Sequence, residues 1–392
     1  HFEPAENHYR IRLRVDGVLH ALPEITTEMG IAITARLKVL GSLDIAEHRL
    51  PQDGQFTVEI SGEPISFRIA TLPCRYGEKI VLRLLHQVDQ ALDLEALGLS
   101  SSQLAAFRQA LNQPQGLLLV TGPTGSGKTV TLYSALQARN REQVNICSVE
   151  DPLEIPIAGM NQTQINPRAG LTFHSVLRAL LRQDPDIVMV GEIRDAETAE
   201  IAIKAAQTGH LVLSTLHTNS APESITRLLD MGMDPFNFAD ALLGVLAQRL
   251  AKRLCSKCKK AYHPDEAEVR HLLDEYCEDL MQTPAFREDP ERAREQILDA
   301  WRQRYGDSKG RFTLYQPVGC EHCTGGYKGR LGLHELMIGS DSVKALIQER
   351  ARVANLLATA LEEGMRTLRQ DGIEKVLAGL TDLKQVRKVC IR

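Results

Sequence analysis

Apolar and polar residues follow two different periods along this chain. Near the N-terminus they alternate around one segment with helical spacing at 30–40, and the alternating runs are 9–15, 55–60, 65–70 and 79–84. Farther along, helical patterns at 172–182 and 198–208 alternate with short apolar runs at 116–121, 144–149, 187–190 and 211–216. The first pattern predicts a small α+β domain with a hairpin turn at Asp16-Gly17. The second predicts an α/β domain whose largely parallel sheet is covered by helices on both faces.

The apolar run at 116–121 leads directly into a glycine-rich loop that opens a helical segment. The loop matches G-x-x-x-x-G-K-[ST] at every position, with the residues Gly122, Pro123, Thr124, Gly125, Ser126, Gly127, Lys128 and Thr129. Its backbone N–H groups and the following helix N-terminus can surround a triphosphate. Lys128 would reach the β- and γ-phosphates, and Thr129 would offer its hydroxyl to Mg²⁺. Because strand, loop and helix come in the required order, ATP binding is favoured over an ordinary glycine-rich turn.

Polar residues follow the later apolar runs, at the strand ends where such sheets bind their ligands. Glu150 follows the second run, Glu192 the third and His217 the last. A carboxylate at such a place can hold Mg²⁺ through water or orient an attacking water. Since Gly191 stands directly at its strand end, Glu192 is expected to polarise water or to touch Mg²⁺ through waters. Capping of a helix or turn stays open for each carboxylate, and a structural role stays open for His217.

The eight cysteines divide into two groups. Four are scattered singly, as expected of reduced cytosolic thiols. The other four form two C-x-x-C pairs, which predicts a structural zinc site at Cys255, Cys258, Cys320 and Cys323. A disulfide or a redox centre is a less favoured alternative. The spacer at 265–308 is charged and helical in pattern, so we expect a solvent-exposed insertion there.

Length and composition set the domain organisation. A chain of 392 residues with 43% apolar content has room for two or three domains of roughly 100–200 residues. The predicted division is an α+β domain, a linker, an α/β core, a tetracysteine subdomain with a helical insertion and a C-terminal helical region, over 1–88, 89–101, 102–250, 251–340 and 341–392.

The net charge and the absence of targeting signals in the sequence argue against several functional classes. The net charge of −4 and the pI of about 6.3 argue against a large nucleic-acid surface. No apolar run approaches the roughly 20 residues of a membrane span, and no signal peptide opens the chain. Because the chain begins at His1 within a strand pattern, we expect a natural N-terminal part to be missing.

Further motifs, taken with the phosphate loop, resemble one family. The chain is similar to the ATPases of type II protein secretion and type IV pilus assembly, the general secretory pathway protein E family. The motifs lie at 14–17, 49–54, 149–154, 182–186, 191–195, 206–210 and 216–219, so the resemblance covers nearly the whole chain. It implies a RecA-like P-loop NTPase domain preceded by a PAS-like domain, a homo-hexameric ring, and ATP hydrolysis coupled to secretion or pilus assembly.

The resemblance also implies roles for individual residues. Arg68 and Arg83 match arginines that the N-terminal domain brings onto the nucleotide phosphates as it closes. Arg178 and Arg182 match motor-domain arginines implicated in activity. Without the resemblance, arginines on a sheet surface would be taken as simply solvated. The expected catalytic carboxylates are Glu192 first and Glu150 second.

The resemblance places the protein in a cellular setting as well. Pilus-retraction ATPases generally lack the C-x-x-C pairs, which favours an assembly or secretion motor. Such a motor is expected in the bacterial cytoplasm, peripheral at the inner membrane, bound to platform proteins through the missing N-terminal domain.

Two alternatives come from other functional classes. A RecA-like DNA-translocating motor is disfavoured by the acidic pI. A nucleotide-dependent switch that barely hydrolyses is disfavoured by the carboxylates and arginines expected around the phosphate loop.

Overall fold

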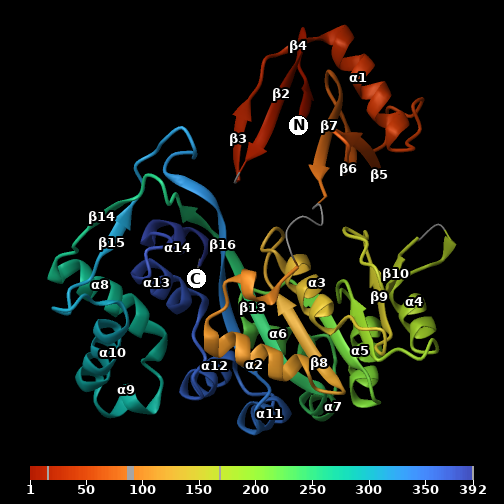
Figure 1. Cartoon of the computed structure of the whole chain (residues 1–392). Helices are drawn as coiled ribbons and strands as arrows, with labels where there is room; N and C mark the ends of the chain where they lie inside the picture. The colour runs from red at the N-terminus through yellow and green to blue at the C-terminus, as the bar shows by residue number, and fades with distance from the viewer. Residues whose placement is uncertain (16, 86–91, 167–168, 391–392) are drawn as a thin grey trace. The chain divides into compact units, whose positions relative to one another are not determined.

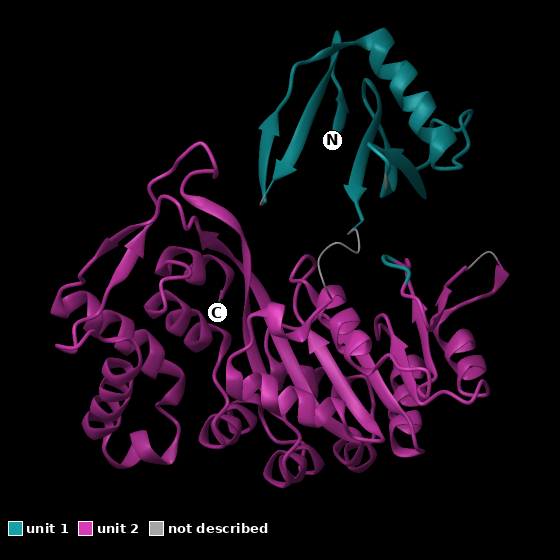
Figure 2. Cartoon of the chain, in the orientation of Figure 1, with its two compact units in different colours: residues 1–91, 154–156 teal, residues 92–153, 157–392 magenta. Residues whose placement is uncertain are grey.

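Two units make up the structure, a computed structural model that describes residues 1–15, 17–85, 92–166 and 169–390. The first unit comprises 1–91 with 154–156, and the second comprises 92–153 with 157–392 (Figure 2). Asp16 of the predicted hairpin turn and the 89–91 part of the predicted linker lie outside the described residues.

The first unit is an antiparallel sheet that packs against one helix in the described ranges (Figure 1). Its strand order is β3-β2-β1-β7-β6-β5, and β4 pairs with β2. The elements are β1 (Phe2–Pro4), β2 (His8–Val15), β3 (Val18–Ala21), β4 (Ile25–Thr26), α1 (Thr27–Leu40), β5 (Gln52–Ile60), β6 (Glu63–Cys74) and β7 (Gly77–Leu84). The four alternating runs of the sequence correspond to β2, β5, β6 and β7, and the helical segment corresponds to α1.

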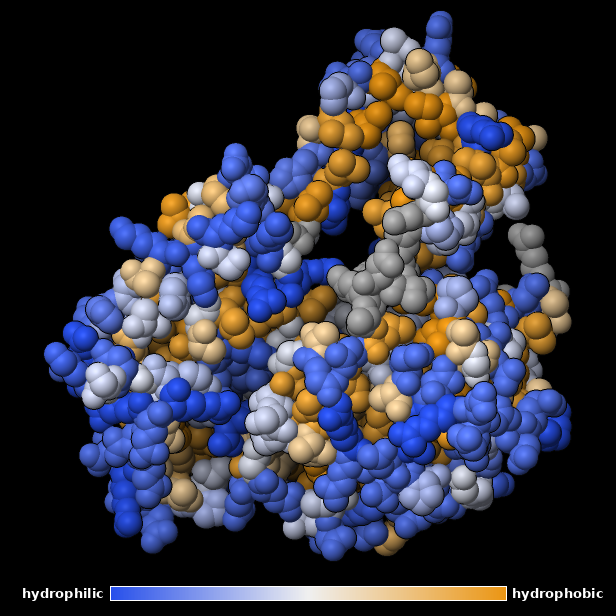
Figure 3. Space-filling view, in the orientation of Figure 1, coloured by the Kyte–Doolittle hydropathy of each residue, from blue (hydrophilic) through white to orange (hydrophobic). Residues whose placement is uncertain are grey.

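Helix α1 buries small and polar residues, whereas several of its apolar residues are exposed. Gly30 must be glycine, because a Cβ there would lie 2.2 Å from the ring of Tyr9. Lys38 is fully buried, and its ammonium lies 3.0 Å from the carboxylate of Glu78. Met29 and Ile31 are exposed instead, and apolar colour gathers over the α1 part of the first unit in Figure 3. The unit therefore carries apolar surface that its own core does not use.

The second unit is built on a seven-stranded sheet. Its order is β10-β9-β11-β12-β8-β13-β16, and every neighbouring pair is parallel except β13 with β16. The strands are β8 (Gly116–Thr121), β9 (Ile146–Glu150), β10 (Met160–Gln164), β11 (Ile187–Val190), β12 (Leu211–Leu216), β13 (Leu242–Leu254) and β16 (Tyr327–Ile338). Strands β8, β9, β11 and β12 are buried along their whole length, which explains their nearly continuous apolar sequence. The predicted α/β class with a largely parallel sheet is confirmed.

Helices surround this sheet (Figure 1). The first group is η1 (Leu94–Leu97), α2 (Ser101–Leu111), α3 (Lys128–Arg139), α4 (Phe173–Leu180), α5 (Ala196–Gln207), α6 (Ala221–Asp230) and α7 (Pro235–Ala241). The C-terminal group is α11 (Asp341–Gln348), α12 (Val353–Glu362), α13 (Leu368–Leu377) and α14 (Leu383–Val389). Asp382 caps α14 by accepting a hydrogen bond from the backbone N–H of Gln385. Within the described ranges, none of the helices combines the length and the apolar character that crossing a bilayer requires.

Three strands of the sheet, β10, β13 and β16, were not predicted from the sequence. Strand β13 runs through the predicted boundary at residue 250, and its antiparallel partner β16 comes from the predicted tetracysteine subdomain. The sheet therefore continues past the segment assigned to the α/β core. The five-part division of the chain stays a prediction.

The segment between the two C-x-x-C pairs is helical but is not a freely solvated insertion. It contains β14 (Lys260–Tyr262), α8 (Glu266–Cys277), η3 (Glu278–Leu280), α9 (Pro284–Glu288), α10 (Pro290–Tyr305) and β15 (Leu314–Gln316). Tyr276 and Trp301 are both nearly fully buried and meet edge to face, with ring centroids 5.1 Å apart. The Tyr276 hydroxyl donates to Glu374 of α13 at 2.9 Å. The helices lie where the sequence predicts them and expose most of their charged residues, but a second, apolar face packs against the C-terminal helices, so the insertion is exposed on one side only.

Candidate nucleotide-binding site and tetracysteine centre

The phosphate loop joins β8 to α3 in a conformation that depends on its glycines. Gly122, Gly125 and Gly127 have φ values of 153°, 80° and 87°, a region that favours glycine. Helix α3 begins at Lys128, and no side chain caps it. The Lys128 ammonium lies over the loop, 2.8 Å from the carbonyl oxygen of Gly122 and 3.1 Å from that of Pro123. Open backbone N–H groups at a helix N-terminus with an ammonium beside them form an anion-binding site.

Three of the predicted site residues meet at the carboxyl ends of the parallel strands. Glu192, just after β11, has one carboxylate oxygen 3.0 Å from Nε2 of His217, which follows β12. His217 Nδ1 lies 3.5 Å from the ammonium of Lys128. The other Glu192 oxygen accepts from Nε of Arg194 at 2.8 Å. The structure thus links the phosphate loop to the glutamate through one imidazole, and it leaves the Glu192 side chain 21% exposed.

Glu150 differs from Glu192 in being deeply buried. It is 3% exposed at the end of β9 and accepts hydrogen bonds from Ser148 Oγ at 2.7 Å and Gln162 Nε2 at 3.1 Å. It also accepts one from the hydroxyl of Tyr133 on α3. These bonds tie α3, β9 and β10 together, which favours a structural contribution. A catalytic role for Glu150 stays a prediction.

The motor-domain arginines lie on and just after α4. Arg178 donates to Glu197 of α5 at 2.9 Å, and Arg182 donates to the backbone carbonyl of Arg178 at 3.1 Å. Thr129, the predicted Mg²⁺ ligand, lies in the first turn of α3 and is half-buried.

Arg68 and Arg83 belong to the first unit. They face each other as cross-strand partners on β6 and β7, and Arg68 also lies 3.5 Å from Asp53. Like charges placed opposite one another on a sheet destabilise it, and the carboxylate of Asp53 offsets part of this repulsion. A role for the two arginines at the nucleotide stays a prediction.

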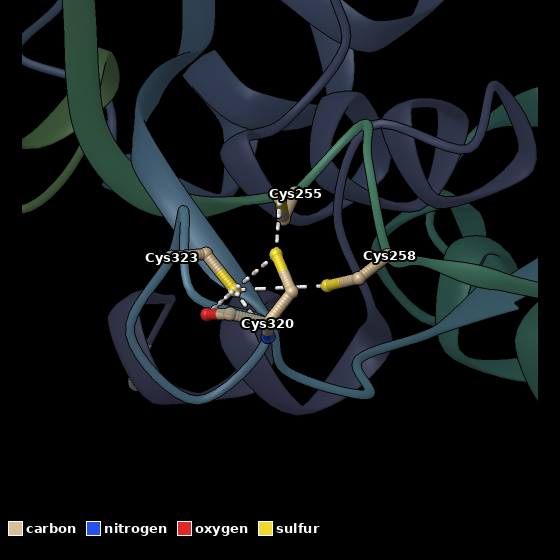
Figure 4. Close-up of side chains that lie close together, drawn as sticks. All are labelled: Cys255, Cys258, Cys320 and Cys323. Carbon is tan, nitrogen blue, oxygen red and sulfur yellow. Dashed lines mark hydrogen bonds between the residues drawn. The ribbon is translucent and has the colours of Figure 1, made fainter.

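The four paired cysteines converge on one point (Figure 4). Cys255 and Cys258 follow β13, whereas Cys320 and Cys323 precede β16, and their sulfur atoms all lie within 4.8 Å of one another. The closest pairs are Cys258 with Cys323 and Cys320 with Cys323, both at 3.6 Å. Tetrahedral zinc with Zn–S bonds of roughly 2.3 Å would place its sulfurs roughly 3.8 Å apart. The donor set and its spacing fit zinc.

Backbone N–H groups donate hydrogen bonds to two sulfur atoms of this cluster, which favours their thiolate form. The N–H of Cys320 donates to the sulfur of Cys323 at 3.3 Å, and the N–H of Gly319 donates to that of Cys258 at 3.4 Å. Burial acts to raise the pKa of the Cys323 thiol, but the Cys320 N–H and the neighbouring thiols outweigh it and lower the pKa to about 7. The thiolate of Cys323, the form that binds metal, is therefore accessible near neutral pH. Burial raises the pKa of Cys258. The His322 N–H acts to lower the pKa of Cys320, but burial and the neighbouring thiols outweigh it and raise that pKa to about 11.

Comparison with known proteins assigns the family. Residues 1–388 match the family described as "Type II/IV secretion system protein". The chain belongs to this family. Relatives of this chain carry type II secretion and type IV pilus assembly names, which is the family that the sequence motifs resemble. That resemblance is therefore confirmed.

Relatives within the Type II/IV secretion system protein family are similar over nearly the whole chain. The "Protein transport protein HofB homolog" of Escherichia coli is 56% identical, with 99% of this chain and 77% of that protein covered. The "Type IV pilus assembly ATPase PilB" of Pseudomonas aeruginosa is 46% identical, with 99% of this chain and 64% of that protein covered. The "Type II secretion system ATPase E" of Vibrio cholerae is 43% identical, with 99% of this chain and 71% of that protein covered. The chain thus spans between 64% and 77% of the length of these relatives.

Solved structures support the fold of this family member. The pilus retraction motor PilT with bound ADP aligns with a TM-score of 0.60 at 24% identity, covering 96% of this chain and 89% of that one. The ATPase DotB of Yersinia pseudotuberculosis aligns with a TM-score of 0.65 at 16% identity, covering 97% and 86%.

Sequence reasoning missed several residues that hold the site in this family member. Tyr133 and Gln162 bind the buried Glu150, and Gln248 binds the phosphate loop. A signal for Gln248 was present, because Gln248-Arg249 is a polar pair inside the long, largely apolar run Leu242–Leu254. A buried polar residue in such a run needs a partner, and here the partner belongs to the site.

Proposed function

We propose that this chain is the ATP-hydrolysing motor part of a machine for type II protein secretion or type IV pilus assembly. The observation that carries the proposal is the link from the phosphate loop to Glu192 through His217 at strand ends of the parallel sheet. Relatives named as secretion and pilus assembly ATPases support the same activity.

In the proposed mechanism, the phosphate loop binds the triphosphate and Lys128 neutralises its terminal phosphates. Mg²⁺ held at Thr129 would supply further positive charge. Glu192 accepts a hydrogen bond from the attacking water and orients it, and its contact with His217 positions the carboxylate. Arg178 and Arg182 contribute positive charge around the nucleotide.

Arg68 and Arg83 are proposed to act only in a closed state of a RecA-like motor domain and a PAS-like first domain. Their paired guanidinium groups would then stabilise charge on the transferring phosphoryl group. Hydrolysis coupled to such closure would let a ring perform mechanical work.

The proposed assembly is a homo-hexamer on the cytoplasmic side of a bacterial inner membrane, in contact with platform proteins. Exposed apolar side chains on the first unit, among them Met29, Ile31 and Leu84, support burial against another surface. The relatives are longer than this chain, and contact with the platform is proposed for parts of the whole protein that this chain does not span.

The tetracysteine centre is proposed to hold one structural zinc ion per chain. Four cysteine ligands leave no open position for chemistry, which is typical of a structural site. The same ion would join the segment that follows β13 to the segment that precedes β16, two paired strands of the seven-stranded sheet.

The experiment that tests this function measures ATP turnover against oligomeric state. Fractions separated by size would be assayed with and without single-stranded DNA, and Lys128→Ala would be assayed in parallel. We expect activity in a hexameric fraction, its loss in Lys128→Ala, and no response to DNA. Stimulation by DNA would support a DNA-translocating motor, which the secretion and pilus names of the relatives do not support. Tight ATP binding with negligible turnover in every fraction would support a switch.

A further inference from the structure

Gln248 contacts the phosphate loop from strand β13, although no motif of the sequence includes it. Its side chain is almost completely buried. The amide Nε2 donates to the backbone carbonyl of Ser126 at 2.6 Å, and the amide Oε1 accepts from the hydroxyl of Thr131 at 2.7 Å. One side chain therefore ties the loop to the first turns of α3.

The orientation of this amide is determined by its partners. The carbonyl of Ser126 can only accept, so the NH₂ group must face it. The carbonyl side of the amide then faces Thr131, whose hydroxyl can donate. Both bonds are buried. Loss of the amide removes this donor from the Ser126 carbonyl, whereas the Thr131 hydroxyl keeps a second acceptor in the carbonyl of Gly127 at 3.3 Å.

The loop also packs against Gln248 without clearance. A Cβ on Gly122 would lie 2.6 Å from the backbone oxygen of Gln248, and a Cβ on Gly127 would lie 3.1 Å from its Nε2. Gly122 is thus required by this strand as well as by its φ value, and a side chain at Gly127 would press against the Gln248 amide. The loop cannot change shape at these points without losing contacts with β13.

The next residue on the same strand holds a second part of the site. Arg249 donates to the backbone carbonyl of Asn219 at 3.0 Å, two residues after His217. Strand β13 therefore contacts both segments whose side chains meet at the anion-binding site.

We propose that Gln248 is a positioning residue that holds the phosphate loop in its nucleotide-binding conformation before the nucleotide arrives. The inference rests on the proposed binding of ATP at this loop. A loop that is ordered in advance costs less to order on binding, so Gln248 contributes mainly to nucleotide affinity.

The test compares nucleotide affinity with turnover in Gln248→Ala. We expect the Kd of a fluorescent ATP analogue to rise about tenfold, because without the amide the free loop can relax to pair the Ser126 carbonyl and must give up that pairing, worth about one buried hydrogen bond, when the nucleotide binds. The kcat at saturating ATP should change much less, because Lys128 and Glu192 are untouched. Gln248→Glu keeps the size but sets a carboxylate against the Ser126 carbonyl, so its Kd should rise at least as much.

Gln370→Ala is the matched control. Gln370 is also fully buried and also donates its Nε2 to a backbone carbonyl, that of Tyr276, at 3.0 Å. Its loss should lower the stability of the chain but leave the Kd for the nucleotide unchanged. A parallel measurement on Lys128→Ala establishes that the analogue binds at the phosphate loop.

Equal changes in Kd for Gln248→Ala and Gln370→Ala would overturn the inference, and so would an unchanged Kd in Gln248→Ala when Lys128→Ala has lost binding. Parent-like binding by Lys128→Ala would instead remove the proposed ATP site itself. If Gln248→Ala does not fold, Thr131→Val removes the donor to Oε1 with little change of shape. Its Kd should rise about threefold, a partial loss of one hydrogen bond, and an unchanged Kd there would also overturn the inference.

Discussion

Disruption of the tetracysteine centre should loosen the segment between the two C-x-x-C pairs. The perturbation is the double substitution Cys258→Ser and Cys323→Ser, which removes one sulfur ligand from each pair. The two sulfur atoms lie 3.6 Å apart although the residues are 65 positions apart in the chain. A metal that joins them closes a long loop, and loss of the metal releases it.

The magnitude follows from the length of that loop. Closing a loop of about 65 residues removes chain entropy equivalent to roughly 4 kcal/mol in the unfolded state. This is an upper limit, because the helices of the segment keep their own contacts, such as that of Tyr276 with Glu374. Converted to an opening equilibrium, roughly 4 kcal/mol corresponds to about a thousandfold faster hydrogen exchange.

Hydrogen exchange with mass spectrometry provides the assay. Peptides covering β14 and β15 should exchange up to about a thousandfold faster in the double variant than in the parent. Peptides covering β9 and β11 should be unchanged, since those strands lie on the far side of β12 and β8 in the sheet. Cys74→Ser, which replaces an exposed cysteine of the first unit, is the matched control.

Two results would refute this reasoning. Elemental analysis of freshly purified, never-chelated parent protein should give one zinc ion per chain, and a value near zero would remove the metal. Unchanged exchange in β14 and β15 of the double variant would show that the cluster does not hold the segment.

Three further predictions concern the motor site and the core. Glu192→Gln should lower kcat about a hundredfold or more with ATP affinity near that of the parent, because a neutral amide orients and polarises the attacking water much less than a carboxylate does; parent-like turnover would exclude Glu192 from the chemistry. Arg68→Ala should lower single-turnover rates while ATP binding and stability stay close to those of the parent, and Arg75→Ala, an exposed arginine of the same unit, should not. Burial raises the pKa of Glu335 from 4.5 to about 7, so the folded chain keeps a proton that the unfolded chain has lost, and stability should fall as pH rises from 4.5 to 7. Urea unfolding across this range should show a flatter dependence for Glu335→Gln, and an identical slope would contradict the assignment.

The sequence by itself determined the features that depend on neighbouring residues. The phosphate loop is eight consecutive residues between a strand and a helix, so its pattern carries its own geometry. Strands β8, β9, β11 and β12 were recognisable because parallel strands buried on both faces are apolar almost throughout. Each C-x-x-C pair is likewise local, and the convergence of the two pairs followed from the chemistry of zinc.

Segments that mix apolar and polar residues were harder to predict from the sequence. Strand β13 contains Gln248 and Arg249, and α1 buries Thr34 and Lys38 while exposing Met29. Such residues contradict a simple inside-outside rule, because their burial depends on a specific polar partner and not on hydrophobicity. The sequence carries the period of an element but not the identity of its partner.

Only the tertiary structure decided which distant residues act together. Gln248 reaches Ser126 across 122 positions of sequence, and His217 stands between Lys128 and Glu192. These contacts exist because the order of strands in the sheet places the ends of β8, β11, β12 and the middle of β13 side by side. Strand order is set by the packing of the whole sheet, which no local stretch of the chain encodes.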